Sequence, residues 1–180
     1  GHREAENGQT QEGRAYVYLG SASGLLTTPS SYLEENRSNL RFGTSVRSAG
    51  DVNGDGYDDV IVGAPNLTNG QTFEGGAYIY LGSASGLSTT YSWLGEGNNA
   101  RANFGGNFLW NGDGVSSAGD VNGDGYDDVV IGAYEYSNGE NREGAAYLYL
   151  GSAVGVSTTP SWQIESNQAN AIYGTSVSSA

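Results

Sequence analysis

Small or aliphatic residues alternate with tyrosines in a segment that the chain carries in three versions. In its middle copy the segment reads AYIYLG at residues 77–82. Because successive side chains of a strand point to opposite faces, this period of two predicts a β-strand. The preceding segment, DDVIVGA at residues 58–64, carries consecutive β-branched residues. Such a run is typical of a strand that is covered on both faces.

Two further strand-like segments complete each repeat unit. GTSVRSAGD at residues 43–51 predicts a first strand, and YSWLGE at residues 91–96, matched by PSWQIE at residues 160–165, predicts a fourth. Glycine makes up 30 of the 180 residues. Because glycine costs ~1 kcal/mol in a helix interior, long helices are not expected. The sequence therefore predicts an all-β chain of short strands between glycine-rich turns.

The repeat length indicates how these strands are arranged. GRAYVYLGSASGL at residues 13–25 returns as GGAYIYLGSASGL at 75–87 and as GAAYLYLGSAVGV at 144–156, a spacing of 62 and then 69 residues. Most of the difference is a seven-residue insertion near GNFLWNGDG, residues 106–114. Four short antiparallel strands that recur at this length favour the blades of a β-propeller. An open β-solenoid is the alternative.

The alignment of the units places both ends of the chain inside a blade. Gly1-His2 aligns with Gly63-Ala64, and Ala180 aligns with Ala118. About three blades' worth of sequence is therefore expected. The units are residues 1–41 (last strands of a preceding blade), 42–103 (a blade), 104–172 (a blade with the inserted loop 106–114) and 173–180 (first strand of a following blade). Because open strand edges invite pairing, we expect either further blades of a longer chain or self-association of copies end to end.

Charge and composition exclude several functions. Twenty acidic side chains face 7 basic ones, all of them Arg, and the net charge is −13. This balance argues against a nucleic-acid surface and against binding to anionic membranes. No apolar run reaches the ~20 residues of a membrane span, so membrane insertion is not expected. The chain has no Cys and no Lys, which excludes a thiol nucleophile, a Schiff base and a P-loop. Glutamates such as Glu74 and Glu143 are interpreted as solvated turn charges, and no catalytic residue or enzymatic role is predicted.

The acidic side chains are concentrated in one duplicated turn. SAGDVNGDGYDDV occurs at residues 48–60 and again at 117–129, and these copies hold eight of the nine aspartates. Counted from the first Asp, oxygen-bearing side chains fall at positions 1, 3, 5 and 9, and Gly stands at position 6. The carbonyl at position 7 can add another oxygen. Ca²⁺ takes 6–8 oxygen ligands, so this pattern predicts a calcium site, with Mg²⁺ as second choice.

Electrostatics supports a bound cation in these turns. Two carboxylates ~5 Å apart repel each other by roughly 3 kcal/mol at an effective dielectric constant near 20. The alternative is a hydrated Asp/Gly turn without an ion, since both residues also favour turns. An EF-hand is excluded because it needs Glu at position 12 and flanking helices. Here position 12 is Val62 or Ile131, inside a predicted strand.

The acidic turn and its flanks resemble FG-GAP repeats, which occur in integrin α-subunit propellers and in many secreted bacterial proteins. Phe42-Gly43 precedes the first turn and Gly63-Ala64-Pro65 follows it. The next unit keeps Phe104-Gly105, but Gly132-Ala133-Tyr134 replaces the final Pro. The resemblance covers essentially the whole chain and implies FG-GAP propeller blades, of the secreted bacterial type.

The resemblance also implies a ligand set for a structural Ca²⁺ ion between the first two strands of each blade. Asp58 and Asp127 are expected to face away from the ion. The implied metal ligands are Asp51, Asn53, Asp55, Tyr57 (through its carbonyl) and Asp59 in the first loop, and Asp120, Asn122, Asp124, Tyr126 (through its carbonyl) and Asp128 in the second. Extracellular modules bind Ca²⁺ with dissociation constants of about 10⁻⁴–10⁻³ M, which would leave such sites empty in cytosol. A secreted or cell-surface location is therefore expected.

The inserted loop is the part of the sequence that departs most from the repeat. Insertions in repeat proteins map to loops, often on the binding face, so Phe108 and Trp110 are candidates for contact with a ligand. The alternative is a longer turn whose aromatic side chains pack onto the neighbouring blade. Asp113 in the same insertion is a weaker candidate for reaching a metal.

Together these observations predict a calcium-binding extracellular module for structure, adhesion or recognition, which could assemble through its incomplete blades. An extracellular protein or a glycan is the expected kind of ligand. The alternative is an accessory propeller domain of a larger secreted enzyme, for example a polysaccharide-degrading one, with catalysis elsewhere.

Overall fold

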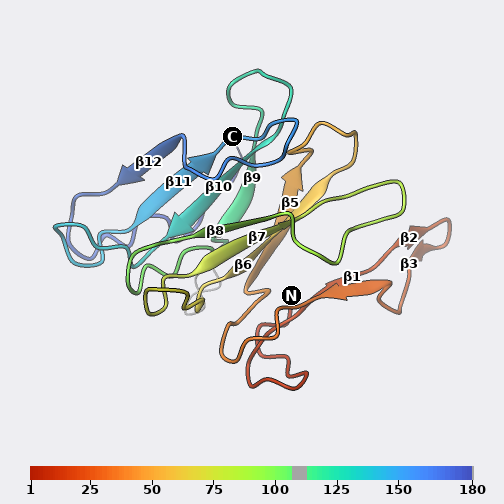
Figure 1. Ribbon diagram of the computed structural model, residues 1–180, viewed down its shortest axis with the longest axis horizontal. Coiled ribbons are helices and arrows are strands. Elements are labelled where there is room, and N and C mark those ends of the chain that lie inside the picture. Colours follow the sequence, from red (N-terminus) through yellow and green to blue (C-terminus); the bar gives the residue numbers. More distant parts are fainter. Residues whose placement is uncertain (107–112, 180) are drawn as a thin grey trace.

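The computed structural model describes residues 1–106 and 113–179, and this part of the chain contains twelve strands and no helix. Ten of these strands belong to three antiparallel sheets that lie side by side along the chain (Figure 1). Two sheets have four strands each, in simple meander order, and the N-terminal sheet has two. The remaining two strands form a short hairpin at the tip of the N-terminal sheet.

The two four-stranded sheets confirm the predicted number and position of strands in each unit. The first sheet has the order β5-β6-β7-β8, and the second has β9-β10-β11-β12. The strands of the first sheet are β5 (Ser45–Gly50), β6 (Asp59–Ala64), β7 (Gly76–Tyr80) and β8 (Trp93–Glu96). Those of the second are β9 (Val115–Gly119), β10 (Asp128–Ala133), β11 (Ala145–Tyr149) and β12 (Trp162–Glu165). The predicted all-β fold of four-stranded antiparallel blades is therefore confirmed.

Two strands of the N-terminal unit form a sheet of their own, and they are the repeat equivalents of the third and fourth strands of the next sheet. β1 (Ala15–Val17) pairs with β4 (Ser31–Leu33), and the connection between them forms the hairpin of β2 (Gly20–Ser21) and β3 (Gly24–Leu25). At the other end, the Val177 N–H group donates a hydrogen bond to the carbonyl of Asp113, just before β9 (2.9 Å).

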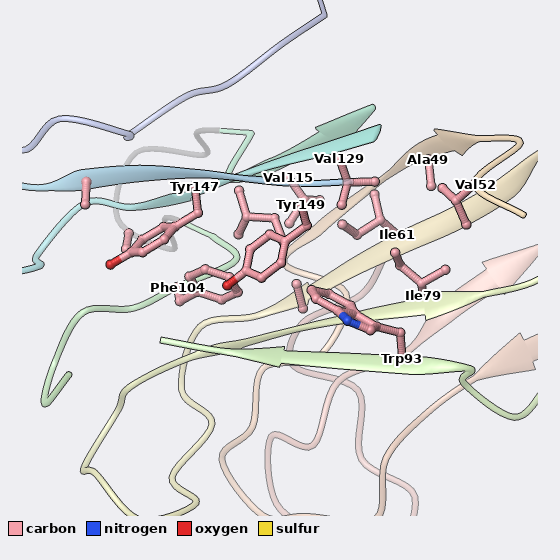
Figure 2. Close-up of a cluster of buried hydrophobic side chains, with 14 of the residues drawn as sticks. Ala49, Val52, Ile61, Ile79, Trp93, Phe104, Val115, Val129, Tyr147 and Tyr149 are labelled. Atoms are coloured by element: carbon pink, nitrogen blue, oxygen red, sulfur yellow. The ribbon is translucent and has the colours of Figure 1, made fainter. Parts of the chain in front are cut away.

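Two hydrophobic cores form, one on each face of the first sheet, because successive side chains of a strand point to opposite faces. Ile61 and Ile79 point toward the second sheet, where they pack in a cluster with Tyr149 (Figure 2). Their neighbours Val62 and Tyr78 point the opposite way, into a cluster with the N-terminal unit. This is the arrangement that the β-branched run in β6 predicted, because both faces of that strand are covered.

Close backbone contacts fix the position of one blade on the next. Phe104, in the second blade's unit, donates its N–H group to the Glu74 carbonyl of the first (3.0 Å), and Gly105 donates its N–H group to the Gly132 carbonyl within the second (3.0 Å). A side chain at Gly63 would overlap the carbonyl oxygen of Gly105, so this position requires glycine. The blades therefore stack closely, with the two acidic loops at the same edge of the sheets (Figure 1).

Candidate metal centre

Each acidic loop connects the first two strands of a four-stranded sheet. Residues 51–58 join β5 to β6, and residues 120–127 join β9 to β10. The pairing register shifts at the base of both loops, which is the signature of a β-bulge. The loop position that the resemblance implied, between the first two strands of a blade, is the one observed.

The first loop is closed by hydrogen bonds from its own backbone to its acidic side chains. Asp51 accepts the N–H group of Asp55 on Oδ1 (3.0 Å) and that of Gly56 on Oδ2 (2.8 Å). Asn53 Oδ1 also accepts the Asp55 N–H group (3.1 Å), and Asp55 Oδ1 accepts the Tyr57 N–H group (3.0 Å). The side-chain oxygens at positions 1, 3 and 5 therefore turn inward over the loop backbone.

The second loop repeats this geometry. Asp120 accepts the N–H groups of Asp124 (3.0 Å) and Gly125 (2.9 Å), and Asp124 Oδ1 accepts that of Tyr126 (3.1 Å). Gly125 has φ +92°, and Gly56 in the first loop has φ +91°. These values lie in the region that favours glycine, which explains why position 6 of the pattern is Gly.

The aspartate at position 9 is buried at the base of each loop. Asp59 accepts the N–H groups of Val52 (2.9 Å) and Gly82 (2.8 Å), and its side chain is fully buried. Burial raises the pKa of the Asp59 carboxyl above its usual range, the two backbone hydrogen bonds lower it, and the negative charges of Asp55 and Asp51 raise it further. A cation would relieve this repulsion.

Asp128 occupies the same environment in the second loop. It accepts the N–H groups of Val121 (3.0 Å) and Gly151 (2.9 Å). The pKa of its carboxyl is also raised, first by burial and then by the charges of Asp124 and Asp120, against the lowering effect of those two hydrogen bonds. Both loops thus hold three mutually repelling carboxylates at positions 1, 5 and 9.

The chemistry of this donor set suits a hard cation. All the side-chain donors are oxygens, and no hydrogen bond from another described residue reaches the carbonyl oxygens of Tyr57 and Tyr126. Within residues 1–106 and 113–179, no three His, Cys, Asp or Glu side chains already lie close enough together to hold a metal ion. A bound ion would therefore bring the carboxylates of a loop closer to one another. The ligand set stays a prediction.

The ion pairs recorded in residues 1–106 and 113–179 do not include a carboxylate of either loop. The pairs recorded between described residues join an arginine to a carboxylate outside both loops. They are Arg3–Glu4, Arg14–Glu34, Arg47–Asp113 and Arg142–Glu135. Asp113, which the sequence suggested as a weaker metal candidate, is therefore engaged by Arg47. Phe108 and Trp110, the candidate contact residues, lie outside the described residues.

The carboxylate of Asp127 lies outside the pattern of ligands but makes a specific contact. It turns away from its own loop, as the resemblance implied, and its Oδ2 accepts the N–H group of Asp51 in the first loop (2.8 Å). Sequence reasoning missed this contact, because nothing in the repeat says which residue of the next blade lies opposite.

The interpretation of Glu74 and Glu143 as solvated charges is wrong. Both side chains are fully buried, as is that of Glu12. Glu74 accepts the N–H group of Asn69 (2.6 Å) and Glu143 that of Asn138 (2.5 Å), so each organises the connection that leads into the third strand of its blade. A Glu-Gly pair precedes this strand in all three units, and that recurrence was the available signal.

The part of the chain that the structure describes offers no helix with the length and apolar character that a membrane crossing requires.

Comparison with known proteins identifies the repeats. The family model described as FG-GAP repeat matches residues 42–80 and 111–149. Both matches contain an acidic loop and the strands that flank it. The resemblance drawn from the Phe-Gly and Gly-Ala dipeptides is therefore confirmed.

Curated relatives extend this match. The chain is 34% identical over 127 residues to integrin alpha-4 of Xenopus laevis, which covers 69% of the chain and 11% of that protein. It is 40% identical over 109 residues to integrin alpha-PS3 of Drosophila melanogaster (61% and 9%), and 36% identical over 125 residues to integrin alpha-2 of Mus musculus (68% and 10%). The chain spans about a tenth of the length of these relatives. They are animal proteins, so the bacterial type stays a prediction. The chain is an integrin-α-like FG-GAP repeat protein.

Proposed function

We propose that this chain is a calcium-stabilised part of an extracellular propeller that serves adhesion or recognition. The observation that supports this proposal best is the pair of acidic loops. Each brings oxygen donors at positions 1, 3, 5 and 9 over its own backbone. Each also keeps three carboxylates within repelling distance of one another.

The role of the ion in this proposal is structural. Each loop carries its implied ligands on the connection between the first two strands of a blade, and Asp59 or Asp128 already ties that connection to the turn after the third strand. A cation at the loop would hold these strand ends together. At about 2 mM free Ca²⁺, dissociation constants of about 10⁻⁴–10⁻³ M stabilise by roughly 0.6–1.8 kcal/mol per site.

The similarity to integrin alpha chains supports an adhesion or recognition role and an extracellular location. The proposal does not include catalysis by these residues. Millimolar Ca²⁺ outside cells matches the weak affinity expected of such loops. The chemistry of any protein or glycan ligand is left open in the proposal.

We also propose that the outer face of the second sheet receives a further blade, from a longer chain or from a second copy. Val130, Leu148 and Trp162 line a hollow of about 420 Å³ on this face. They are the repeat equivalents of Ile61, Ile79 and Trp93, which are buried against the second sheet. A face that carries apolar side chains of similar size at the same positions fits the same kind of partner.

Thermal unfolding with and without calcium tests the main proposal. We expect millimolar Ca²⁺ to raise the melting temperature relative to EGTA, because the ion binds the folded loops. Asp55→Ala and Asp124→Ala each remove one implied ligand, so each variant should lose about half of the shift, and the double variant nearly all of it. An identical melt in EGTA and in Ca²⁺ would contradict the proposal.

A second measurement tests the open face. If a copy of the chain covers it, sedimentation should show concentration-dependent association that Leu148→Asp abolishes. The control is Val154→Asp, a substitution at an exposed position outside the hollow (97% exposed). Association that survives Leu148→Asp would exclude this face as the contact between copies.

A further inference from the structure

The two candidate calcium loops are bonded directly to each other. The Asp51 N–H group donates to Asp127 Oδ2 (2.8 Å), and the Asp127 N–H group donates to the Asp51 carbonyl (3.0 Å). Asp127 stands between Tyr126 and Asp128, two implied ligands of the second loop. Its partner Asp51 provides position 1 of the first loop. One residue of each loop thus belongs to a two-bond bridge between them.

Side-chain packing reinforces this bridge. The ring of Tyr126 lies over Gly54 so closely that a methyl carbon built on Gly54 would stand 2.6 Å from Tyr126 Cε1. A methyl group on Gly50 would overlap the Asp127 carboxylate. We name the Asp127–Asp51 bonds together with the Tyr126–Gly54 contact the interloop clasp. Glycines at two positions of the first loop region leave the space that the clasp occupies.

The chain contains its own control for the clasp. Asp58 is the repeat equivalent of Asp127, and no hydrogen bond to its carboxylate is found among the described residues. The neighbouring side chain of Tyr57, the equivalent of Tyr126, is 44% exposed. On the other side, Asp120 is the equivalent of Asp51. Its backbone makes no hydrogen bond within residues 1–106 and 113–179, and nothing lies within 4 Å of a methyl group built on Gly119.

We infer that the interloop clasp couples the two calcium sites, so that an ion bound in the second loop strengthens calcium binding in the first. This inference rests on the proposed function, because it requires that both loops bind calcium. Asp127 acts as a positioning residue: it fixes the backbone of Asp51 on both sides, and thereby the direction of the carboxylate at position 1.

The coupling has a simple physical origin. An empty loop must be ordered before it can surround an ion, and that ordering reduces the observed affinity. An ion in the second loop would fix Tyr126 and Asp128, and with them Asp127 between them. The ordered Asp127 then holds Asp51 in place before the first loop binds. Coupling is reciprocal, so an ion in the first loop strengthens the second by the same factor.

Site-resolved calcium titration of the full chain tests the inference. The amide NMR signals of Gly56 and Gly125 report on the two loops separately. Asp124→Ala removes the second site. We expect this change to weaken calcium binding at the first loop by about fivefold or more, the lower range of measured coupling between sites. In the Asp127→Ala background the same change should alter the first loop by less than about twofold, because uncoupled sites are independent.

Matched variants separate the clasp from simple charge effects. Asp127→Ala should weaken the first loop, whereas Asp58→Ala should leave the second loop unchanged. Asp127→Asn keeps an oxygen that accepts the Asp51 N–H group and should retain most of the coupling. If Asp127→Asn weakens the first loop as much as Asp127→Ala does, charge alone explains the effect and the clasp is excluded as its cause.

The outcomes distinguish this inference from the proposed function. Calcium binding at both loops with no effect of Asp124→Ala on the first loop overturns the coupling and leaves the proposed function intact. An absence of calcium binding at either loop overturns both. A second readout needs no calcium: hydrogen exchange of the Asp51 amide should speed up in Asp127→Ala and stay unchanged in Asp58→Ala. Equal exchange in both variants overturns the clasp itself.

Discussion

Residues 48–60 and 117–129 have one sequence in two different surroundings. Inside both loops the hydrogen bonds that the two copies share agree within about 0.2 Å, from the position 1 aspartate to the buried aspartate at position 9, and the second loop adds one bond from the Gly123 N–H group to Asp120 Oδ1 (2.8 Å). Outside the loops the environments diverge. Val52 is fully buried whereas its equivalent Val121 is 53% exposed, because the second blade covers the first loop and nothing in the described chain covers the second.

This difference separates the contacts that depend on the sequence of the loop from the contacts that depend on a neighbouring blade. The inner bonds recur because the Asp, Asn and Gly residues that make them recur with the same spacing. The outer contacts belong to the interface between two blades and need the next blade to be present. Substitutions at equivalent positions can therefore measure the two contributions independently within one molecule.

The tryptophans of the fourth strands should show the largest difference. Trp93 is 7% exposed, packs edge to face on Tyr149 (5.1 Å between ring centroids) and donates from Nε1 to the Ser157 carbonyl (3.0 Å). Trp162 is 47% exposed. In the chain of residues 1–180, Trp93→Ala should cost about 3–5 kcal/mol of unfolding free energy, and Trp162→Ala about 1 kcal/mol. Urea denaturation measures both, and equal losses would mean that the open face is covered.

The buried aspartates should behave alike. Asp59 and Asp128 each accept two backbone hydrogen bonds at matching distances in fully buried sites. Asp59→Ala and Asp128→Ala should therefore each cost about 2–3 kcal/mol in EGTA, because two backbone N–H groups at the base of the loop lose their acceptor. Losses that differ by more than about 1 kcal/mol would show that the neighbouring blade reaches into the loop base.

Pattern and spacing predicted most of the fold. The alternation in AYIYLG and the β-branched run in DDVIVGA correspond to β7 and β6, and the Phe-Gly and Gly-Ala dipeptides lie where consecutive blades touch. These features depend on short stretches of sequence, so a period of two and a recurring dipeptide are enough to predict them. The positions of the acidic loops, between the first two strands of each blade, could be predicted for the same reason.

Contacts between blades could not be predicted in this way. Asp127 and Asp51 are bonded to each other although 76 residues separate them, and their identical neighbours in the sequence give no sign of it. Glu74 and Glu143 are hydrophilic residues in turns, and composition alone places such residues in water. Their burial depends on backbone N–H groups that converge on them only in the folded connection. Glu74 accepts two such N–H groups, from Asn69 and Gln71, and Glu143 accepts one, from Asn138; these hydrogen bonds reduce the cost of burying a carboxylate.

Alanine substitutions of the glycines that end β5 and β9 should differ in their cost. Gly50 and Gly119 have nearly equal φ, +75° and +73°, so alanine should cost about 1 kcal/mol at either position through backbone strain alone. At Gly50 the methyl group would also displace the Asp127 carboxylate from the Asp51 N–H group. Gly50→Ala should therefore cost about 1 kcal/mol more than Gly119→Ala, the contribution of one hydrogen bond. Equal losses in chemical denaturation would contradict the role of the clasp.

The tyrosines at position 7 should show the smallest difference. The half-buried ring of Tyr126 covers Gly54 of the neighbouring loop, whereas Tyr57 is 44% exposed. Tyr126→Ala should cost about 1 kcal/mol and Tyr57→Ala about 0.3 kcal/mol, in proportion to the apolar area that each ring loses from burial. Tyr126→Phe keeps the ring on Gly54 and should be nearly neutral, which makes it the control for the hydroxyl group. Because neither phenol oxygen belongs to the implied ligand set, all three variants should still bind calcium. A larger loss of unfolding free energy for Tyr57→Ala than for Tyr126→Ala would mean that the ring of Tyr57 is covered by a contact that this comparison does not include.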